Sequence, residues 1–146
     1  MNALTNKGIV LASRPNGAPV AANFRVEQVP VPAPGPGEVL LRNRYLSLDP
    51  YMRGRMEEGP SYAAPVALDA VMEGRTVAEV LASNHPGFAI GEHVLAPGNW
   101  QTHAVINGDQ LSRKLEDNGL PISTALGVYG MPGFTAYVGL QEIGKL

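Results

Sequence analysis

The chain has 146 residues, enough for one ordinary domain with a core of its own. Charged residues make up 16% and hydrophobic residues 45%, so the low hydrophobicity and high charge of a disordered segment are missing. The formal net charge is −2 without blocks of like charge, which argues against binding to a nucleic-acid backbone. Cysteine is absent, which excludes disulfides, cysteine nucleophiles and thiolate zinc sites.

The first ten residues, MNALTNKGIV, show no targeting signal. They lack the long apolar stretch and the small-residue cleavage site of a signal peptide. We therefore expect a cytoplasmic protein.

Up to about residue 110, the sequence predicts short strands separated by turns. The 17 glycines and 13 prolines are an unusually high share and are typical of a turn-rich chain. The expected strands are residues 24–29, 38–48, 71–81, 93–96 and 101–106. Many short strands joined by Gly/Pro turns predict a mainly β fold, either a barrel or a sandwich.

Residues 118–141 contain no charged side chain, and their number would suffice to cross a bilayer. The five glycines and two prolines among them would interrupt a lipid-exposed helix and leave backbone groups unpaired. We therefore expect this stretch to be buried against other protein rather than in a membrane.

The end of the chain predicts a helix that starts at Pro132, a residue suited to the first helical turn. Phe134, Tyr137 and Val138 share one helical stripe, and Gly144 is a C-terminal stop. Because the sequence ends two residues later, we expect a domain cut from a longer protein.

The sequence argues against three other kinds of site. The three histidines (His85, His93 and His103) have no metal-ligand spacing, so surface or structural roles are favoured. Gly127, Gly130 and Gly133 lack the strand, spacing and acidic residue of a dinucleotide fingerprint, which favours close backbone packing. No serine lies in a G-x-S-x-G turn, which argues against a Ser-His-Asp triad.

Residues 43–56, NRYLSLDPYMRGRM, are the strongest candidate site. Pro50 favours an extended Asp49, so the strand should end in a fixed turn that points Tyr51 outward. A phenol there is a neutral hydrogen-bond donor at pH 7, although packing is the alternative role. For Arg53 and Arg55, a local ion pair that staples the turn to Asp49 is the favoured interpretation.

Several segments together resemble a known family. They are LASRPNGAPV, PAPGPGEVLLRNRYLSLDPYMRGRM, SYAAPV, SNHPGFAIGEHV and GVYGMPGFTAYVGLQEIG, in this order. The chain resembles the N-terminal domain of zinc-independent medium-chain dehydrogenase/reductase proteins, in the branch with curcumin, prostaglandin and 2-alkenal reductases. LSLDPYMRGRM and MPGFTAY are the specific motifs, and the resemblance covers nearly the whole chain.

The resemblance implies that residues 1–146 form a GroES-like β-barrel with short helices, the substrate and catalytic domain. Its C-terminal helix would lead into a Rossmann domain that is not present in this chain and that would hold most of the NADPH. The implied reaction is reduction of the carbon–carbon double bond of α,β-unsaturated ketones or aldehydes, without a metal. The full-length protein would be a homodimer, and the isolated domain would be inactive.

The same resemblance implies roles for individual residues. Tyr51 would be the catalytic donor or substrate-orienting group, and Tyr62 would close over the substrate. Asn43, Met131 and Thr135 would contact the cofactor. Asp49, Arg53 and Arg55 would be architectural.

Two further expectations follow. Without its cofactor domain, the chain should aggregate or self-associate through the apolar segment 131–143. The alternative function is a stand-alone GroES-like protein-interaction module without catalysis, which would form a closed oligomer or capture a protein partner.

Overall fold

A computed structural model describes residues 4–146, and it is mainly β. The first two strands, β1 (Thr5–Leu11) and β2 (Phe24–Pro30), pair antiparallel as a separate ribbon. The other strands form a five-stranded antiparallel sheet in the order β6-β3-β4-β5-β7. They are β3 (Glu38–Leu46), β4 (Thr76–Ser83), β5 (His93–Ala96), β6 (His103–Asn107) and β7 (Arg113–Leu115).

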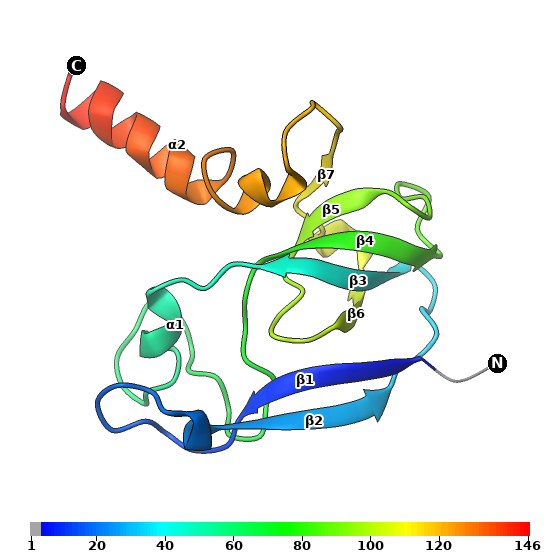
Figure 1. Cartoon of the computed structure of the whole chain (residues 1–146), viewed down its shortest axis with the longest axis horizontal. Coiled ribbons are helices and arrows are strands. Elements are labelled where there is room, and N and C mark those ends of the chain that lie inside the picture. The colour runs from blue at the N-terminus through cyan, green and yellow to red at the C-terminus, as the bar shows by residue number, and fades with distance from the viewer. Residues whose placement is uncertain (1–3) are drawn as a thin grey trace.

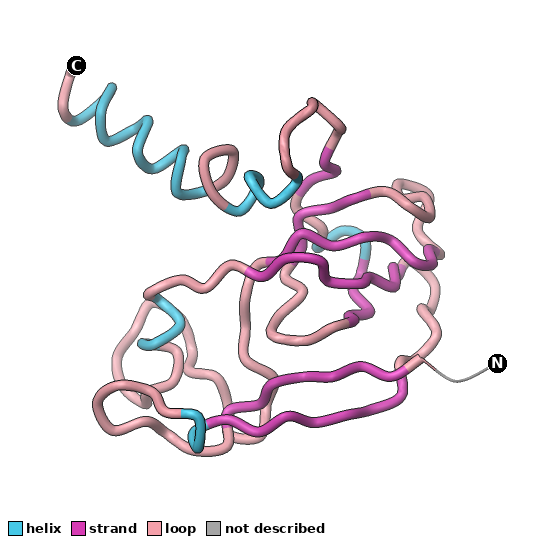
Figure 2. The backbone as a smooth tube through the Cα atoms, in the orientation of Figure 1, coloured by secondary structure: helices cyan, strands magenta, loops and turns pink. Residues whose placement is uncertain are grey.

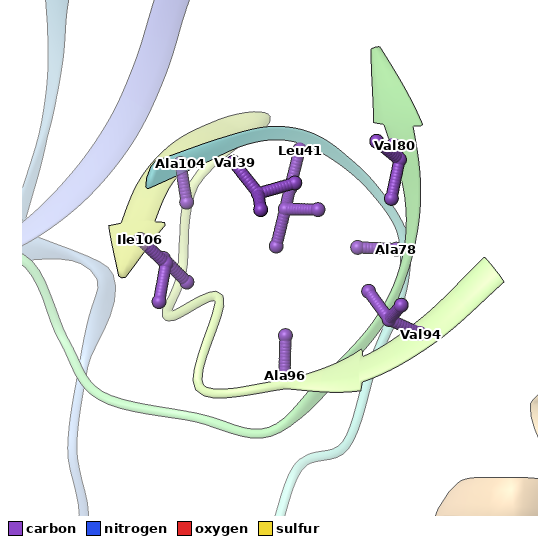
Figure 3. Close-up of a cluster of buried hydrophobic side chains, with 8 residues drawn as sticks. All are labelled: Val39, Leu41, Ala78, Val80, Val94, Ala96, Ala104 and Ile106. Atoms are coloured by element: carbon purple, nitrogen blue, oxygen red, sulfur yellow. The ribbon is translucent and has the colours of Figure 1, made fainter. Parts of the chain in front are cut away.

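The five-stranded sheet curls around a core of small and branched apolar side chains (Figure 3). These residues alternate along each strand, as Val39 and Leu41 do in β3 and Val94 and Ala96 do in β5. Such period-two alternation turns every second side chain to the same face of a strand. The core residues are Val39, Leu41, Ala78, Val80, Val94, Ala96, Ala104 and Ile106.

A second core cluster joins the β1–β2 ribbon to the loops that pack against it. Leu11, Met56, Val66 and Met72 are buried there, with Phe24, Ala70 and Trp100 packed against them. The rings of Phe24 and Trp100 stack with their centroids 5.7 Å apart. This cluster fixes the loop that follows α1 (Tyr51–Gly54) against the ribbon.

The predicted barrel is present as a curled sheet, but its strands do not close into a ring. Among residues 4–146, the ribbon and the sheet are joined by isolated bridges, Gly8 with Gln101 and Val10 with Val71. Strand β1 was not predicted, and neither was the three-residue β7. The strand expected at 71–81 begins only at Thr76, because residues 71 and 72 pair with β1 instead.

Helical segments connect and end the chain. Three short 3₁₀ segments occur at η1 (Ala21–Asn23), η2 (Gly108–Gln110) and η3 (Ile122–Leu126). The predicted terminal helix is confirmed as α2 (Met131–Val138), which continues as η4 (Gly139–Ile143) and extends away from the sheets (Figures 1 and 2). No helix in the described part of the chain has both the length and the apolar character needed to span a membrane.

The start of α2 depends on close backbone approach at two glycines. A Cβ at Gly130 would overlap the carbonyl of Ala125, and one at Gly133 would overlap the carbonyl of Val128. The packing role expected for these two glycines is therefore confirmed. At Gly127, by contrast, a Cβ would meet Thr124 only at ordinary contact distance.

Candidate active site

The turn after β3 places Tyr51 at the first position of α1. Ser47 donates from Oγ to Asp49 at 2.9 Å, and the backbone N–H of Met52 donates to the carbonyl of Asp49. The side chain of Met52 is buried and holds the short helix against the domain. Tyr51 itself remains half-buried and faces a surface cavity, so it does not lie inside the core.

Tyr51 and Tyr62 line the same cavity, which has a volume of about 320 Å³. Tyr62 comes from the loop after α1 and is strongly exposed, at 83%. The same cavity is also lined by three charged residues, Arg55, Glu73 and Arg75. The structure therefore brings together the two tyrosines that were predicted to act on the substrate.

The environment of Tyr51 favours a neutral phenol. Burial raises the pKa of Tyr51 above its ordinary value, and the carboxylates of Glu73 and Asp49 raise it further, while Arg75 opposes them. A tyrosine with a raised pKa stays protonated throughout the neutral range. The hydroxyl of Tyr51 is therefore available as a hydrogen-bond donor.

The local ion pair predicted between Asp49 and the arginines is wrong. Arg55 instead donates to both carboxylate oxygens of Glu73, from Nε and, at 2.8 Å, from Nη2. Arg53 donates to the carbonyl of Gly17 and pairs with Glu57. Glu73 and Gly17 come from other segments and Glu57 follows α1, so the two arginines tie α1 to its surroundings rather than to its own preceding turn.

Asn43 lies apart from the tyrosine cavity. Its amide nitrogen donates to the carbonyls of Gly98 and Gln101, at 2.9 and 2.7 Å, and its oxygen accepts from Thr76. These bonds hold the loop between β5 and β6 against β3. The predicted contact of Asn43 with a cofactor stays a prediction.

Met131 lines a second cavity, of about 260 Å³, with Pro132 and Leu126. Ser47, Asp49 and Arg75 border the same cavity, so Arg75 lies at the boundary of both. Thr135 is exposed on α2 and lines neither cavity. The residues predicted to contact the cofactor are therefore not gathered at one place by this chain alone.

Sequence reasoning missed Glu73 and Arg75 as site residues. Both lie in the segment that was expected to continue β4, where charged residues suggested only a solvent-facing strand position. The signal was the glycine between them. A Cβ at Gly74 would overlap Leu46 and crowd Met52 and Trp100, so the backbone approaches the core closely and its charged neighbours stay beside the cavity.

The histidines do not come together. Within residues 4–146, no group of three His, Cys, Asp or Glu side chains could hold a metal ion. His85 lies 3.3 Å from a carboxylate oxygen of Asp109. His103 is buried, and burial lowers the pKa of its imidazole.

The sequence matches a family of enzyme domains. Residues 7–113, well over half of the chain, match the family described as the N-terminal domain of oxidoreductase. The chain therefore belongs to this family. The resemblance to the branch with curcumin, prostaglandin and 2-alkenal reductases, which the sequence motifs indicated, is confirmed.

Individual relatives place the chain more closely. It is 55% identical over 140 residues to the NADPH-dependent curcumin reductase of Escherichia coli, covering 96% of this chain and 40% of the relative. It is 41% identical over 133 residues to rabbit (Oryctolagus cuniculus) prostaglandin reductase 1, covering 88% of this chain and 35% of the relative. The chain thus spans about two fifths of the length of the curated relatives it matches.

A solved structure shows the same fold. The crystal structure of CurA from Vibrio vulnificus in complex with NADPH matches with a TM-score of 0.86 and 54% identity. The match covers 96% of this chain and 41% of the CurA chain. The predicted GroES-like, mainly β fold is confirmed.

Proposed function

We propose that this chain is the substrate-side domain of an NADPH-dependent oxidoreductase. The reaction would reduce the carbon–carbon double bond of α,β-unsaturated ketones or aldehydes. The observation that carries the proposal is the convergence of Tyr51 and Tyr62 on one cavity, with carboxylates that favour a neutral Tyr51. The names of the relatives, a curcumin reductase and a prostaglandin reductase, support the choice of a reductase.

The chain's part in the reaction would be to bind the enone and stabilise charge. NADPH supplies a hydride to the β-carbon of the enone and leaves as NADP⁺, and the α-carbon then takes a proton. Negative charge develops on the carbonyl oxygen as the β-carbon is reduced. A donor already aimed at such an oxygen stabilises the charge without reorganising. Tyr51 would donate this hydrogen bond, and Tyr62 would cover the other side of the substrate.

The surface around Met131 fits one end of the cofactor. Leu126, Met131 and Pro132 offer apolar area beside the polar edge formed by Ser47 and Asp49. A flat ring with an amide substituent, such as nicotinamide, suits an apolar surface with a polar edge. We include Asn43 and Thr135 as cofactor contacts on the family resemblance, and we assign most of the cofactor to a Rossmann domain of the same protein. Cytoplasmic location and homodimerisation belong to the same proposal.

The test replaces the matching part of the Escherichia coli curcumin reductase with this chain and measures NADPH oxidation with an added enone. The expected result is enone-dependent turnover. Tyr51→Phe should lower kcat by about 100-fold, since loss of one such donor costs on that order, while NADPH binding stays unchanged. A chimera that binds NADPH but oxidises none with any enone contradicts the proposal, and equal kcat in the Phe variant removes Tyr51 from the mechanism.

The alternative function, an interaction module, makes a different prediction for the chain itself. It expects a closed oligomer of fixed size, or a protein partner, whether or not a cofactor domain is present. Sedimentation of the chain and of the chimera separates the two cases. If the fixed oligomer persists in the chimera and turnover is absent, the module is favoured.

A further inference from the structure

The loop that carries Tyr62 has few bonds of its own. Within the described part of the chain, residues 59–65 make no hydrogen bond. The loop is closed at its neck, where the backbone N–H of Val66 donates to the carbonyl of Arg55 at 2.8 Å. Met56 and Val66 are buried in the second core cluster. The position of Tyr62 therefore depends on how firmly this neck is held.

Arg14 holds the neck from another part of the chain. Its Nη1 donates to the carbonyl of Met56 at 3.1 Å and to that of Val66 at 2.6 Å. A single guanidinium thus bridges the two ends of the loop. Its Nη2 also lies 3.4 Å from a carboxylate oxygen of Glu58, the residue just before this loop. Hydrogen bonds from a charged donor are stronger than neutral ones.

The segment that carries Arg14 is held by hydrogen bonds of its own. It is the β1–β2 loop, residues 12–23, and Asn23 closes it. The Asn23 side chain donates to Ser13 Oγ and accepts from the backbone N–H of Val20. The backbone carbonyl of Asn23 accepts from the backbone N–H of Ala12. Pro15, next to Arg14, is buried. These bonds and the buried Pro15 thus hold the β1–β2 loop in place, although none of its residues lines the tyrosine cavity.

A second arginine connects the same two regions, this time from α1 to the β1–β2 loop. Arg53, on α1, donates from Nε and Nη2 to the carbonyl of Gly17, at 3.0 and 2.7 Å. Gly17 adopts a positive φ of 78°, the left-handed conformation that favours glycine. Helix α1 carries Tyr51, so the same β1–β2 loop contacts the supports of both tyrosines.

We infer that the β1–β2 loop is a positioning element for the substrate cavity, and that Arg14 is the positioning residue that sets the place of Tyr62. The inference rests on the proposed function only for its activity readout. Arg14 acts through the neck of the loop and not by touching substrate. Its loss should free residues 57–65 without loosening the curled sheet, whose core lies elsewhere.

The experiment compares Arg14→Ala, Arg14→Lys and the matched control Arg44→Ala. Arg44 is an exposed arginine that pairs with Glu79 on the sheet, away from the loop. Amide hydrogen exchange is measured on the chain as it stands. We expect exchange of the Val66 amide, whose N–H donates across the neck of the loop, to rise about ten-fold or more in Arg14→Ala, with strands β3 and β4 unchanged. Arg14→Lys should restore part of the protection, because a lysine keeps the charge but not the planar fork.

Activity is then measured in the chimera with the Escherichia coli reductase. We expect Arg14→Ala to raise KM for the enone by about ten-fold with kcat changed by less than about two-fold, and Arg44→Ala to change neither. Unchanged exchange of the Val66 amide in Arg14→Ala overturns the inference whether or not the chimera is active. Equal loosening of the loop, β3 and β4 also overturns it, because Arg14 would then only stabilise the fold. An inactive chimera with the expected exchange pattern counts against the proposed function instead.

Discussion

Glu73 accepts from both Nε and Nη2 of Arg55, and this pair forms part of the cavity wall beside Tyr51. The two residues are 18 positions apart and come from different segments, the C-terminal end of α1 and the connection into β4. Their pairing places the Glu73 carboxylate near the Tyr51 phenol, and Arg55 balances the charge of that carboxylate. The electrostatics of Tyr51 therefore depend on a contact between segments.

The first prediction concerns the titration of Tyr51. The variant Glu73→Gln removes one negative charge and leaves Arg55 positive, and both changes favour tyrosinate. The pKa of Tyr51 should therefore fall, and ultraviolet titration of the chain, compared with its Tyr51→Phe variant, measures it. Glu57→Gln is the control, since Glu57 pairs with Arg53 and is no cause of the raised pKa. An unchanged Tyr51 pKa in Glu73→Gln contradicts the prediction.

The same shift has a consequence for stability. A phenol whose pKa is raised by folding contributes stability below its unfolded pKa, near 10. That contribution is lost as the pH rises through the folded pKa. Glu73→Gln should weaken this dependence, because burial and Asp49 still raise the pKa of Tyr51, whereas Tyr51→Phe should abolish it.

The second prediction concerns Asn43. Its side chain makes three hydrogen bonds that hold the loop between β5 and β6, so Asn43→Ala should leave two carbonyls and Thr76 without their partner. We expect a loss of about 2–4 kcal/mol in the free energy of unfolding. Urea denaturation of the chain measures this loss. The control is Asn84→Ala, which removes an exposed bond to Pro34 and should cost less than about 1 kcal/mol. Equal effects of the two variants would show that Asn43 has no special structural role.

The third prediction uses two glycines in the C-terminal helical region. Gly133→Ala forces a Cβ against the carbonyl of Val128, so the start of α2 must shift. Gly139→Ala meets no atom within 4 Å and should instead stabilise the helix, by up to about 1 kcal/mol. Circular dichroism and thermal unfolding of both variants provide the measurement. If both alanines are tolerated alike, the close approach at Gly133 has no energetic consequence.

The fourth prediction concerns the exposed apolar side chains of α2 and η4. Phe134, Tyr137, Leu140 and Ile143 are all more than half exposed, and apolar patches of this kind mark an interface. The isolated chain should therefore self-associate as its concentration rises, as sedimentation velocity would show. Phe134→Glu should reduce the association, whereas Val26→Glu, at an exposed apolar position on β2, should not. A clean monomer at every concentration is the opposing result.

Much of the fold could be predicted because its core follows a local pattern. Val39 and Leu41 are fully buried and alternate with partly buried neighbours, so β3 was predicted to within two residues. Strand β1 was missed because Asn6, Lys7 and Gly8 interrupt the apolar pattern, although pairing with β2 stabilises the strand. Pairing between distant segments decides such cases, and a single strand does not reveal its partner.

The candidate site could likewise be predicted where local sequence defined it, but not where it depends on contacts between distant segments. The turn at Asp49-Pro50 and the family motifs together indicated Tyr51, and the SYAAPV loop indicated Tyr62. The distant partners of the arginines were not predictable, because Glu73, Gly17 and the carbonyls that bind Arg14 lie 18 to 52 positions away. Local spacing suggested Asp49 as the partner of Arg53 and Arg55, and the tertiary path of the chain brings other acceptors closer.

Arg75 borders both the cavity of the two tyrosines and the cavity beside Met131. A replacement at this position alters the walls of two compartments at once. A substitution at Arg75 that alters substrate preference would therefore also reshape the neighbouring cavity, to which Met131 and Pro132 of α2 contribute.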